Sequence, residues 1–205
     1  MPKANGKCPW PERRPRDHHK EFKWDAVRFA NKTYAVYDAV TRSTDWCVWM
    51  DADTFVHSPW SYDNFVAQLP DDCWITYVGR GKGSQTWPEC GFYGLNLNDN
   101  TCKQFIEEFE RVYEDPENGI FTMEEWHDSY VFGTILNNMK VNAPHVHDYS
   151  ANIYNNPAKT GGGGHPLINS ELGRWIDHLK GVRKKEGRSR NKDLMEKRQE
   201  AYWQG

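Results

Sequence analysis

The sequence lacks the long apolar segments of a membrane protein. No apolar run in the chain approaches the roughly 18 residues that a spanning helix needs, and the mean hydropathy is −0.91. The first residues, Met-Pro-Lys-Ala-Asn-Gly-Lys, also lack the apolar core of a secretory signal peptide. We therefore predict a cytoplasmic protein without a membrane span.

Cysteines are too few and too scattered for a disulfide framework. There are five, an odd number, and none belongs to a Cys-x-x-Cys pair. Cys47 and Cys73 lie in apolar runs, where a free cysteine behaves as a small buried side chain. This pattern favours a reducing compartment, which again predicts a cytoplasmic location.

An excess of positive charge is also missing. The 26 Lys and Arg against 29 Asp and Glu give a net charge of −3, so we expect no nucleic-acid partner. Aromatic residues are abundant instead, at 14% with ten tryptophans. Aromatic rings can fill a core or form platforms on which sugars stack, and composition leaves both uses open.

The order of apolar and turn-forming segments predicts a single α/β domain. The 205 residues are enough for one domain with a sizeable core. Residues 1–21, with four prolines, are expected to form an extended arm, and residues 185–205 a charged tail or surface helix. Helices are predicted over residues 22–41, 61–69, 101–113 (with Asn100 as N-cap), 129–136 and 167–179, and strands over residues 46–50, 73–78, 91–97 and 141–146.

Two carboxylates directly after the first predicted strand are the strongest functional signal. Residues 46–50 carry no charge, and Asp51 and Asp53 follow them. Ligands of open α/β sheets bind beyond the carboxyl ends of strands, and one or two carboxylates commonly hold Mg²⁺. The pair could instead form a turn in which Asp53 acts as a cap. The uncharged strand before it and the motifs below favour a metal site.

Charged residues near two predicted helices have both structural and functional interpretations. Arg28 and Lys32 share one side of a helix, as solvated surface or as a cationic pair that faces a diphosphate. His127 and Asp128 lie where the chain turns apolar, and they fit a buried pair as well as a catalytic one. Neither choice is settled by the local pattern.

The C-terminal part contains further ambiguous groups. His145 and His147 could share one strand face and one metal, although two exposed histidines at a strand end are the simpler interpretation. The glycine run at residues 161–164 could be the hinge of a mobile loop or a linker without function. Residues 178–184 have the composition of a helix C-terminus, with His and Lys before a glycine.

Taken in order, these motifs resemble the GT-A superfamily of nucleotide-sugar-dependent glycosyltransferases over about residues 22–184. Val48-Trp-Met-Asp-Ala-Asp-Thr54 is similar to the metal-binding Asp-x-Asp segment of the family. Gly91-Phe-Tyr-Gly-Leu-Asn-Leu97 resembles its glycine-bearing strand beside donor and acceptor, and Trp126-His-Asp-Ser129 resembles its later acidic motif. His178-Leu-Lys-Gly181 resembles the C-terminal element of retaining members, which adds a third metal ligand and phosphate donors.

The resemblance implies a Rossmann-related domain with a central mixed sheet flanked by helices. It implies transfer of a hexosyl group from a nucleotide-sugar donor to a hydroxyl acceptor, with retention favoured, and Mn²⁺ or Mg²⁺ held by Asp51, Asp53 and His178. The other implied site residues are Asp128, His127 and Glu89 as catalytic or orienting groups; Arg28, Lys32, Asp51, Ala52, Asp53, Lys180, Gly181, Arg183 and Lys184 at the donor diphosphate; and Gly91, Phe92, Tyr93 and Trp126 near the sugar and acceptor.

The N-terminal half of such a domain is short in this chain. Only fifty residues precede Asp51, where GT-A domains have two or three strand–helix units that bind the nucleoside. The chain could be truncated, could take that half from a partner chain, or could bind donors differently. Two alternatives stay open: a non-catalytic remnant that acts as a binding or assembly module, and a metal-dependent phosphoester hydrolase or nucleotidyl-transfer enzyme.

Overall fold

The computed structural model describes Lys7 and residues 18–81, 87–154 and 165–205, which form the helices and strands of an α/β protein. The chain divides into two compact units, Met1–Cys47 with Asn96–Pro144 and Val48–Leu95 with His145–Gly205. Most of the predicted N-terminal arm and the glycine run at residues 161–164 lie outside the described residues. No described helix has both the length and the apolar character that crossing a bilayer requires.

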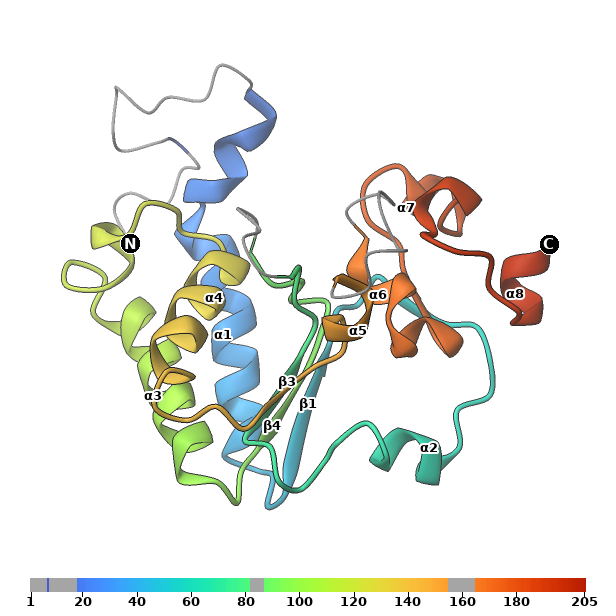
Figure 1. The fold of residues 1–205 in the computed structure, drawn as a ribbon. Helices are drawn as coiled ribbons and strands as arrows, with labels where there is room; N and C mark the ends of the chain where they lie inside the picture. The colour runs from blue at the N-terminus through green and yellow to red at the C-terminus, as the bar shows by residue number, and fades with distance from the viewer. Residues whose placement is uncertain (1–6, 8–17, 82–86, 155–164) are drawn as a thin grey trace. The chain divides into compact units, whose positions relative to one another are not determined.

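The first unit is built on three helices, α1 (Ala26–Val40), α3 (Asn100–Glu114) and α4 (Asp128–Met139), which lie side by side in Figure 1. The 3₁₀ turns η2 (His18–Trp24) and η3 (Ile120–Thr122) accompany them. The helix predicted from residue 22 begins only at Ala26, because the Asp25 carboxylate accepts a hydrogen bond from the Arg28 amide at 3.2 Å and caps it there.

Helix α3 has the predicted apolar face but a different cap. Its buried residues are the expected ones, Cys102, Phe105, Ile106, Phe109, Val112 and Tyr113. Asp99, not Asn100, is the N-cap, because its carboxylate accepts hydrogen bonds from the amides of Thr101 and Cys102 at 2.6 and 3.2 Å. The rings of Phe105 and Phe109 pack edge-on against Phe132 of α4, and such ring pairs contribute about 0.5–1.5 kcal/mol each.

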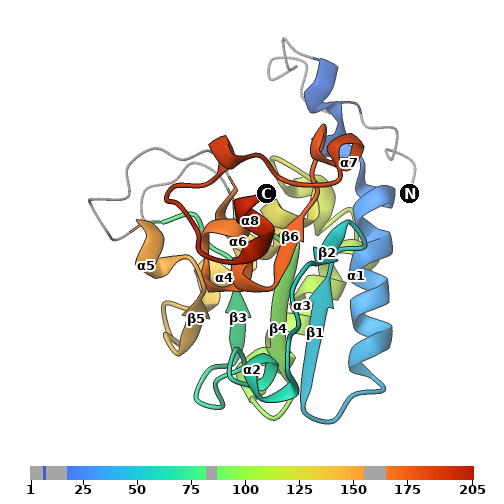
Figure 2. The same ribbon diagram turned by 90° about the vertical axis from the view of Figure 1, so that its right-hand side faces the viewer.

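The second unit contains most of a mixed four-stranded sheet in the order β1-β4-β3-β5, seen in Figure 2. The strands are β1 (Trp46–Met50), β3 (Ile75–Tyr77), β4 (Phe92–Asn96) and β5 (Val146–Asp148). β3 is antiparallel to β4 and parallel to β5, so the predicted mixed α/β sheet is confirmed.

The last strand of this sheet begins later than the predicted residues 141–146. The amides of Asn142 and Ala143 both donate to the Met139 carbonyl at 3.1 Å, so these residues form the turn that ends α4. Pro144 follows and has no amide N–H to give to a strand ladder. His147 lies on β5 opposite Thr76, and neither His147 nor His145 belongs to a possible metal group among the described residues.

A second sheet pairs β2 (Thr54–Val56) antiparallel with β6 (Ile176–His178). The helix predicted over residues 167–179 is wrong, because the segment forms α6 (Pro166–Asn169), η4 (Glu171–Arg174) and then β6. Extended backbone angles at Ser170 end α6. At Gly173 a Cβ atom would lie 2.1 Å from the Ile168 carbonyl oxygen, so the tight turn there requires glycine.

The C-terminal residues form several short elements, and within residues 185–205 Ser189, Asp193 and Trp203 are buried while the others are exposed or half-buried. They contain α7 (Arg183–Glu186), η5 (Asn191–Asp193) and α8 (Ala201–Gln204), and the second unit also has α2 (Tyr62–Val66) and α5 (Ala151–Tyr154). The Trp203 indole donates to the Gly173 carbonyl at 2.8 Å. It completes a buried cluster of Val78, Phe92, Tyr149, Leu167, Ile168, Leu172, Ile176 and Trp203.

Candidate metal centre

Strand ends of the second unit bring two carboxylates and one imidazole together. Asp51 and Asp53 lie in the turn between β1 and β2, which is closed by a hydrogen bond from the Thr54 amide to the Asp51 carbonyl at 2.9 Å. His178 lies opposite Thr54 in the β2–β6 pairing, and the Leu179 amide donates to the Asp53 carbonyl at 2.9 Å. Pairing of the two strands therefore positions His178 beside the aspartates.

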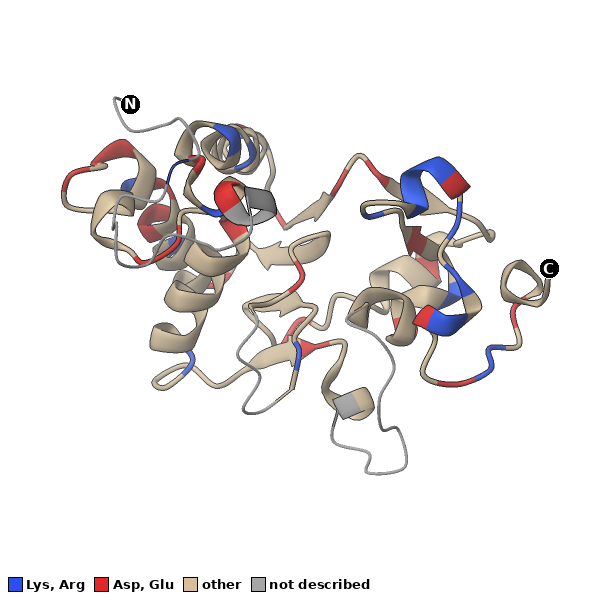
Figure 3. Ribbon diagram, turned by 90° about the horizontal axis from the view of Figure 1, so that it is seen from above, with Lys and Arg blue, Asp and Glu red and all other residues tan. Residues whose placement is uncertain are grey.

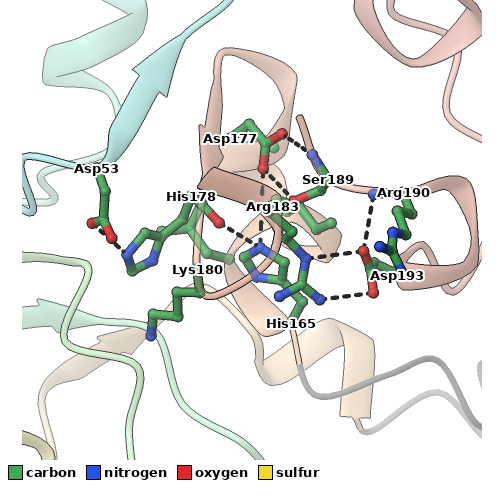
Figure 4. Close-up of polar contacts among 12 residues, drawn as sticks. Asp53, His165, Asp177, His178, Lys180, Arg183, Ser189, Arg190 and Asp193 are labelled. Carbon is green, nitrogen blue, oxygen red and sulfur yellow. Dashed lines mark hydrogen bonds and ion pairs between the residues drawn. The ribbon is translucent and has the colours of Figure 1, made fainter. Parts of the chain in front are cut away.

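The three side chains form a set of ligands that fits a divalent cation. His178 Nε2 lies 3.0 Å from Asp53 Oδ1, a contact drawn in Figure 4. The same nitrogen lies 3.5 Å from Asp51 Oδ2. The three ligand atoms lie within 4.8 Å of one another, and this is the group among the described residues that could hold a metal ion. The imidazole is fully buried and each aspartate is 26% exposed, so a cation can reach the carboxylates. Carboxylate oxygens suit Mg²⁺ and Mn²⁺, and imidazole suits transition metals.

Gly91 leaves the space in which the His178 ring lies. A Cβ atom at this position would be 2.3 Å from both Cε1 and Nδ1 of His178. The Gly91 carbonyl also accepts a hydrogen bond from the Asp51 amide at 2.9 Å. Gly91, which was predicted to lie beside donor and acceptor, thus packs its backbone against the ring of His178.

Glu89 and Lys180 surround the other nitrogen of His178. Glu89 Oε1 is 2.8 Å from His178 Nδ1 and 3.1 Å from Lys180 Nζ. Burial opposes ionisation of Glu89, but the nearby His165, the hydrogen bond from His178 and the charge of Lys180 outweigh it and hold the pKa of Glu89 well below its ordinary value. Glu89 is therefore a buried anion at neutral pH.

Polar contacts also anchor the backbone of β6 on both sides of His178. Asp177 is completely buried and accepts hydrogen bonds from the amide and hydroxyl of Ser189 at 2.7 and 2.6 Å (Figure 4). It also accepts one from the Tyr202 hydroxyl at 2.9 Å. His165 Nε2 lies 2.9 Å from the His178 carbonyl oxygen. The sequence contained no signal for His165 or Asp177, because their partners are 12 to 25 residues away in the chain.

Lys184 already places a positive charge at this centre. Its Nζ lies 2.9 Å from Asp53 Oδ2. Burial opposes ionisation of Asp53, but the hydrogen bond and charge of Lys184 and the charge of His178 lower the pKa of Asp53 below its ordinary value. The site thus attracts positive charge. The ammonium group of Lys184 contacts Oδ2 of Asp53, and it would compete with a divalent ion for this carboxylate.

Replacement of Lys184 by alanine is expected to strengthen Mn²⁺ binding in the absence of nucleotide, because the competing ammonium is removed. An exposed ion pair contributes about 0.2–1 kcal/mol, so the gain should be at most about fivefold. Calorimetric titration with Mn²⁺ measures it. Lys185→Ala, which removes the same charge from the same helix, is the control, and weaker binding in Lys184→Ala alone would contradict the prediction.

The predicted diphosphate contacts near α7 differ in how accessible they are. Helix α7 contains Arg183, Lys184 and Lys185 in succession. Figure 3 shows such basic segments in blue in the C-terminal part of the chain. The Arg183 guanidinium is engaged in two hydrogen bonds to Asp193, at 2.9 and 2.7 Å. The side chains of Lys184 and Lys180 are 58% and 43% exposed and can reach a ligand. Gly181 has a positive φ of 59°, and Ala52 is exposed between the aspartates.

The predicted residues Lys32 and Asp128 form an ion pair in the first unit. Lys32 Nζ lies 2.9 Å from Asp128 Oδ2, with both side chains largely buried. Burial opposes ionisation of Asp128, but the charge and hydrogen bond of Lys32 lower the pKa of Asp128 below its ordinary value. Arg28, one turn earlier, lies over the ring of Phe29 at 5.7 Å and does not share this ion pair.

This ion pair predicts a pH-dependent stability. Because the pKa of Asp128 is depressed in the folded state, its stabilisation is present above the unfolded value of about 4 and is lost as the pH falls below it. Asp128→Asn is expected to lower the free energy of unfolding by about 1.5–3 kcal/mol at pH 6.5 and by less at pH 3. Denaturant unfolding of both proteins at the two pH values measures this, and a difference that does not change with pH would contradict it.

His127 caps helix α4, and both of its ring nitrogens have protein partners. Nδ1 accepts a hydrogen bond from the Tyr130 amide at 3.3 Å, and Nε2 lies 2.7 Å from Glu125 Oε2. Lys23 pairs with the same glutamate. Neither nitrogen is free to take a proton from a substrate in this arrangement, so the geometry assigns His127 to holding the start of α4.

The aromatic residues predicted near the sugar lie in the core. Phe92 and Tyr93 are 1% exposed, and Trp126 is not exposed at all. Phe92 belongs to the buried cluster of the second unit, and Trp126 packs against Phe121 at a centroid distance of 4.8 Å. In this structure these three rings are packed in the core, so they are not exposed to the sugar that the sequence suggested as their partner.

The likeness of this chain to known proteins is limited. No protein-family model matches the sequence, and no curated protein matches it. A solved structure described as the crystal structure of a glycosyltransferase involved in the glycosylation of the major capsid of PBCV-1 is similar to it, with 14% sequence identity and a TM-score of 0.48. The similarity covers 85% of this chain and 80% of that one.

Proposed function

We propose that this chain is a metal-dependent glycosyltransferase, which transfers a sugar from a nucleotide-sugar donor to a hydroxyl acceptor. The observation that carries the proposal is the meeting of Asp51, Asp53 and His178 in the second unit, with their ligand atoms within 4.8 Å of one another. The sequence motifs imply a shared metal for the same three residues.

The roles follow from the charge of the leaving group. A nucleoside diphosphate leaves with concentrated negative charge, and a bound Mn²⁺ or Mg²⁺ supplies Lewis-acid stabilisation of that charge. Asp51 and Asp53 bind the ion through carboxylate oxygens, and His178 binds it through Nε2. Lys180 and Lys184, whose ammonium groups lie 3.1 Å from Glu89 and 2.9 Å from Asp53, contact the diphosphate together with the Gly181 amide.

Asp128 is the proposed orienting group for the donor sugar, as the motif resemblance implies. Its place in the first turn of α4 gives the carboxylate a fixed position, held by Lys32. The resemblance of the His178 element also leads us to expect retention of the anomeric configuration.

The test is release of nucleoside diphosphate from a panel of nucleotide-sugars, with Mn²⁺ or Mg²⁺ and with a chelator. We expect release from at least one donor, complete dependence on the metal, and a product whose anomeric coupling in proton NMR reports retention. Release that continues at full rate in the chelator would contradict metal dependence, and an inverted product would contradict retention alone.

A non-catalytic binding module is the second candidate. No strand precedes β1 in residues 18–45, so the strand–helix units that bind the nucleoside in GT-A domains have no counterpart in that described segment. A partner chain that supplies those units is a related possibility. Calorimetry with Mn²⁺ and nucleotide-sugars separates these cases, because a remnant should bind neither ligand in a coupled manner, and a split enzyme should do so only with its partner.

A two-metal hydrolase or nucleotidyl-transfer enzyme receives less support. Such sites hold two cations about 3.5–4 Å apart, and they usually supply more carboxylates than one Asp-x-Asp pair. Among the described residues, one group could hold an ion, and that group includes a histidine. We therefore expect no hydrolysis of simple phosphodiesters by the purified protein.

A further inference from the structure

Glu89 is unable to act on a sugar directly, because its carboxylate has no exposed surface. Its side chain is 0% exposed, in a part of the protein where Asp51 and Asp53 remain 26% exposed. The Glu89 amide donates to the Val78 carbonyl at 2.8 Å, which fixes the backbone beside β3. A substrate would have to displace this packed segment to reach the carboxylate.

Glu89 instead faces the ring nitrogen of His178 that points away from the aspartates. Oε1 lies 2.8 Å from His178 Nδ1, while His178 Nε2 lies 3.0 Å from Asp53 Oδ1. Lys180 at 3.1 Å and His165 at 3.8 Å approach the same oxygen of Glu89. These contacts hold the Oε1 atom of Glu89 toward the imidazole.

A hydrogen bond from Nδ1–H to Glu89 leaves the Nε2 lone pair directed at the aspartates. Metal-binding histidines commonly donate their second N–H to a carboxylate, which sets the tautomer and the ring orientation. Gly91 limits the ring from a different direction, because even one added carbon would lie 2.3 Å from Cε1 and Nδ1. Backbone packing thus holds the ring plane, and Glu89 selects which nitrogen is presented.

We propose that Glu89 is a positioning residue, which orients His178 so that Nε2 binds the divalent cation together with Asp51 and Asp53. This replaces the catalytic role that the sequence suggested for Glu89. The inference rests on the metal centre of the proposed function, but it concerns the hydrogen bond at Nδ1 and not the reaction of any donor.

The test uses the full chain and Mn²⁺ alone, without nucleotide. Titration followed by electron paramagnetic resonance measures Mn²⁺ affinity, and pulsed measurements of the bound ion detect ¹⁴N coupling from a directly bound imidazole. The wild-type protein should show this ¹⁴N coupling. Glu89→Leu, which has similar volume but no acceptor, should lose the coupling and bind Mn²⁺ about 10–100-fold more weakly.

Two further variants separate positioning from general loss of structure. Glu89→Gln keeps an amide oxygen that can accept from Nδ1–H, so it should retain the ¹⁴N coupling and lose less than about tenfold in affinity. Asp193→Asn removes another largely buried carboxylate of the same unit, one that accepts its hydrogen bonds from Arg183 and Arg190. It should lose stability without losing the coupling.

The outcomes are distinct. Retention of ¹⁴N coupling and wild-type affinity in Glu89→Leu would overturn the proposal. Loss of the coupling in Glu89→Gln as complete as in Glu89→Leu would also overturn it, because charge and not the accepted hydrogen bond would then hold the ring. A wild-type protein that shows the expected coupling but releases no nucleoside diphosphate would overturn the proposed function and leave the role of Glu89 intact.

Discussion

Replacing Asp53 by asparagine is expected to slow metal-dependent release of nucleoside diphosphate by about 10²–10³, the usual cost of removing one preorganised charge stabiliser. Asp53 lies between His178 and Lys184, at 3.0 and 2.9 Å, so its carboxylate is the central ligand of the candidate centre. The amide of asparagine keeps the size of the side chain but removes its negative charge. Steady-state rates at saturating Mn²⁺ measure the effect, and Asp51→Asn should behave in the same way.

Measuring the free energy of unfolding of the variant distinguishes a loss of catalysis from a loss of folded protein. The Lys184 side of the ion pair with Asp53 is 58% exposed, so loss of this pair should change the free energy of unfolding by less than about 1 kcal/mol. Asp63→Asn, at an exposed position in the first turn of α2, is the control and should leave the rate unchanged. Unchanged turnover in both Asp51→Asn and Asp53→Asn would eliminate these aspartates as the metal centre of the proposed reaction.

Replacing Gly91 by alanine should weaken Mn²⁺ binding by about 10–100-fold, although no ligand atom is removed. The new methyl group would lie 2.3 Å from Cε1 and Nδ1 of His178, so the imidazole must move away from the aspartates. Crowding of this kind costs about 1–3 kcal/mol of stability. Mn²⁺ titration and thermal unfolding of the same samples measure both effects.

Gly119→Ala is the matched control for this prediction. A Cβ atom there would also lie 2.3 Å from a neighbour, the Val112 carbonyl oxygen, but Gly119 belongs to the first unit and contacts no metal ligand. It should lose stability and keep its Mn²⁺ affinity. If Gly91→Ala bound Mn²⁺ as tightly as Gly119→Ala, the close packing of His178 on Gly91 would not be needed for the metal centre.

Local patterns predicted those features that depend on residues close together in the chain. The uncharged strand β1, the carboxylates after it and the buried face of α3 were all visible in the local pattern. The apolar repeat of α3 predicts its buried face, whereas in β1 only Cys47 is buried and Met50 is exposed. The cap of α3 was misplaced by one residue, from Asp99 to Asn100. Both residue types are good caps, and only backbone angles choose between them.

The predicted helix over residues 167–179 failed for a different reason. Its apolar residues are spaced as in a helix, but Ile176, Asp177 and His178 pair with β2, and the gain from that pairing outweighs local helix propensity. The C-terminal segment was likewise expected to be solvated. Its Ser189 and Trp203 are buried because Asp177 and Gly173 offer them hydrogen-bond partners that exist only in the folded chain.

The α/β class, the aspartate pair after an uncharged strand, and His178 as a candidate ligand could all be predicted from composition and motif order, because these depend on residues close together in the chain. The folded chain brings His178 to 3.0 Å from Asp53, although the two residues are 125 positions apart in the sequence. It also buries Glu89 beside Nδ1 of His178. The rings of Phe92, Tyr93 and Trp126 become core residues in the same way. The physical reason is that strand pairing and burial are long-range, and the position of each side chain depends on partners that the local sequence does not specify.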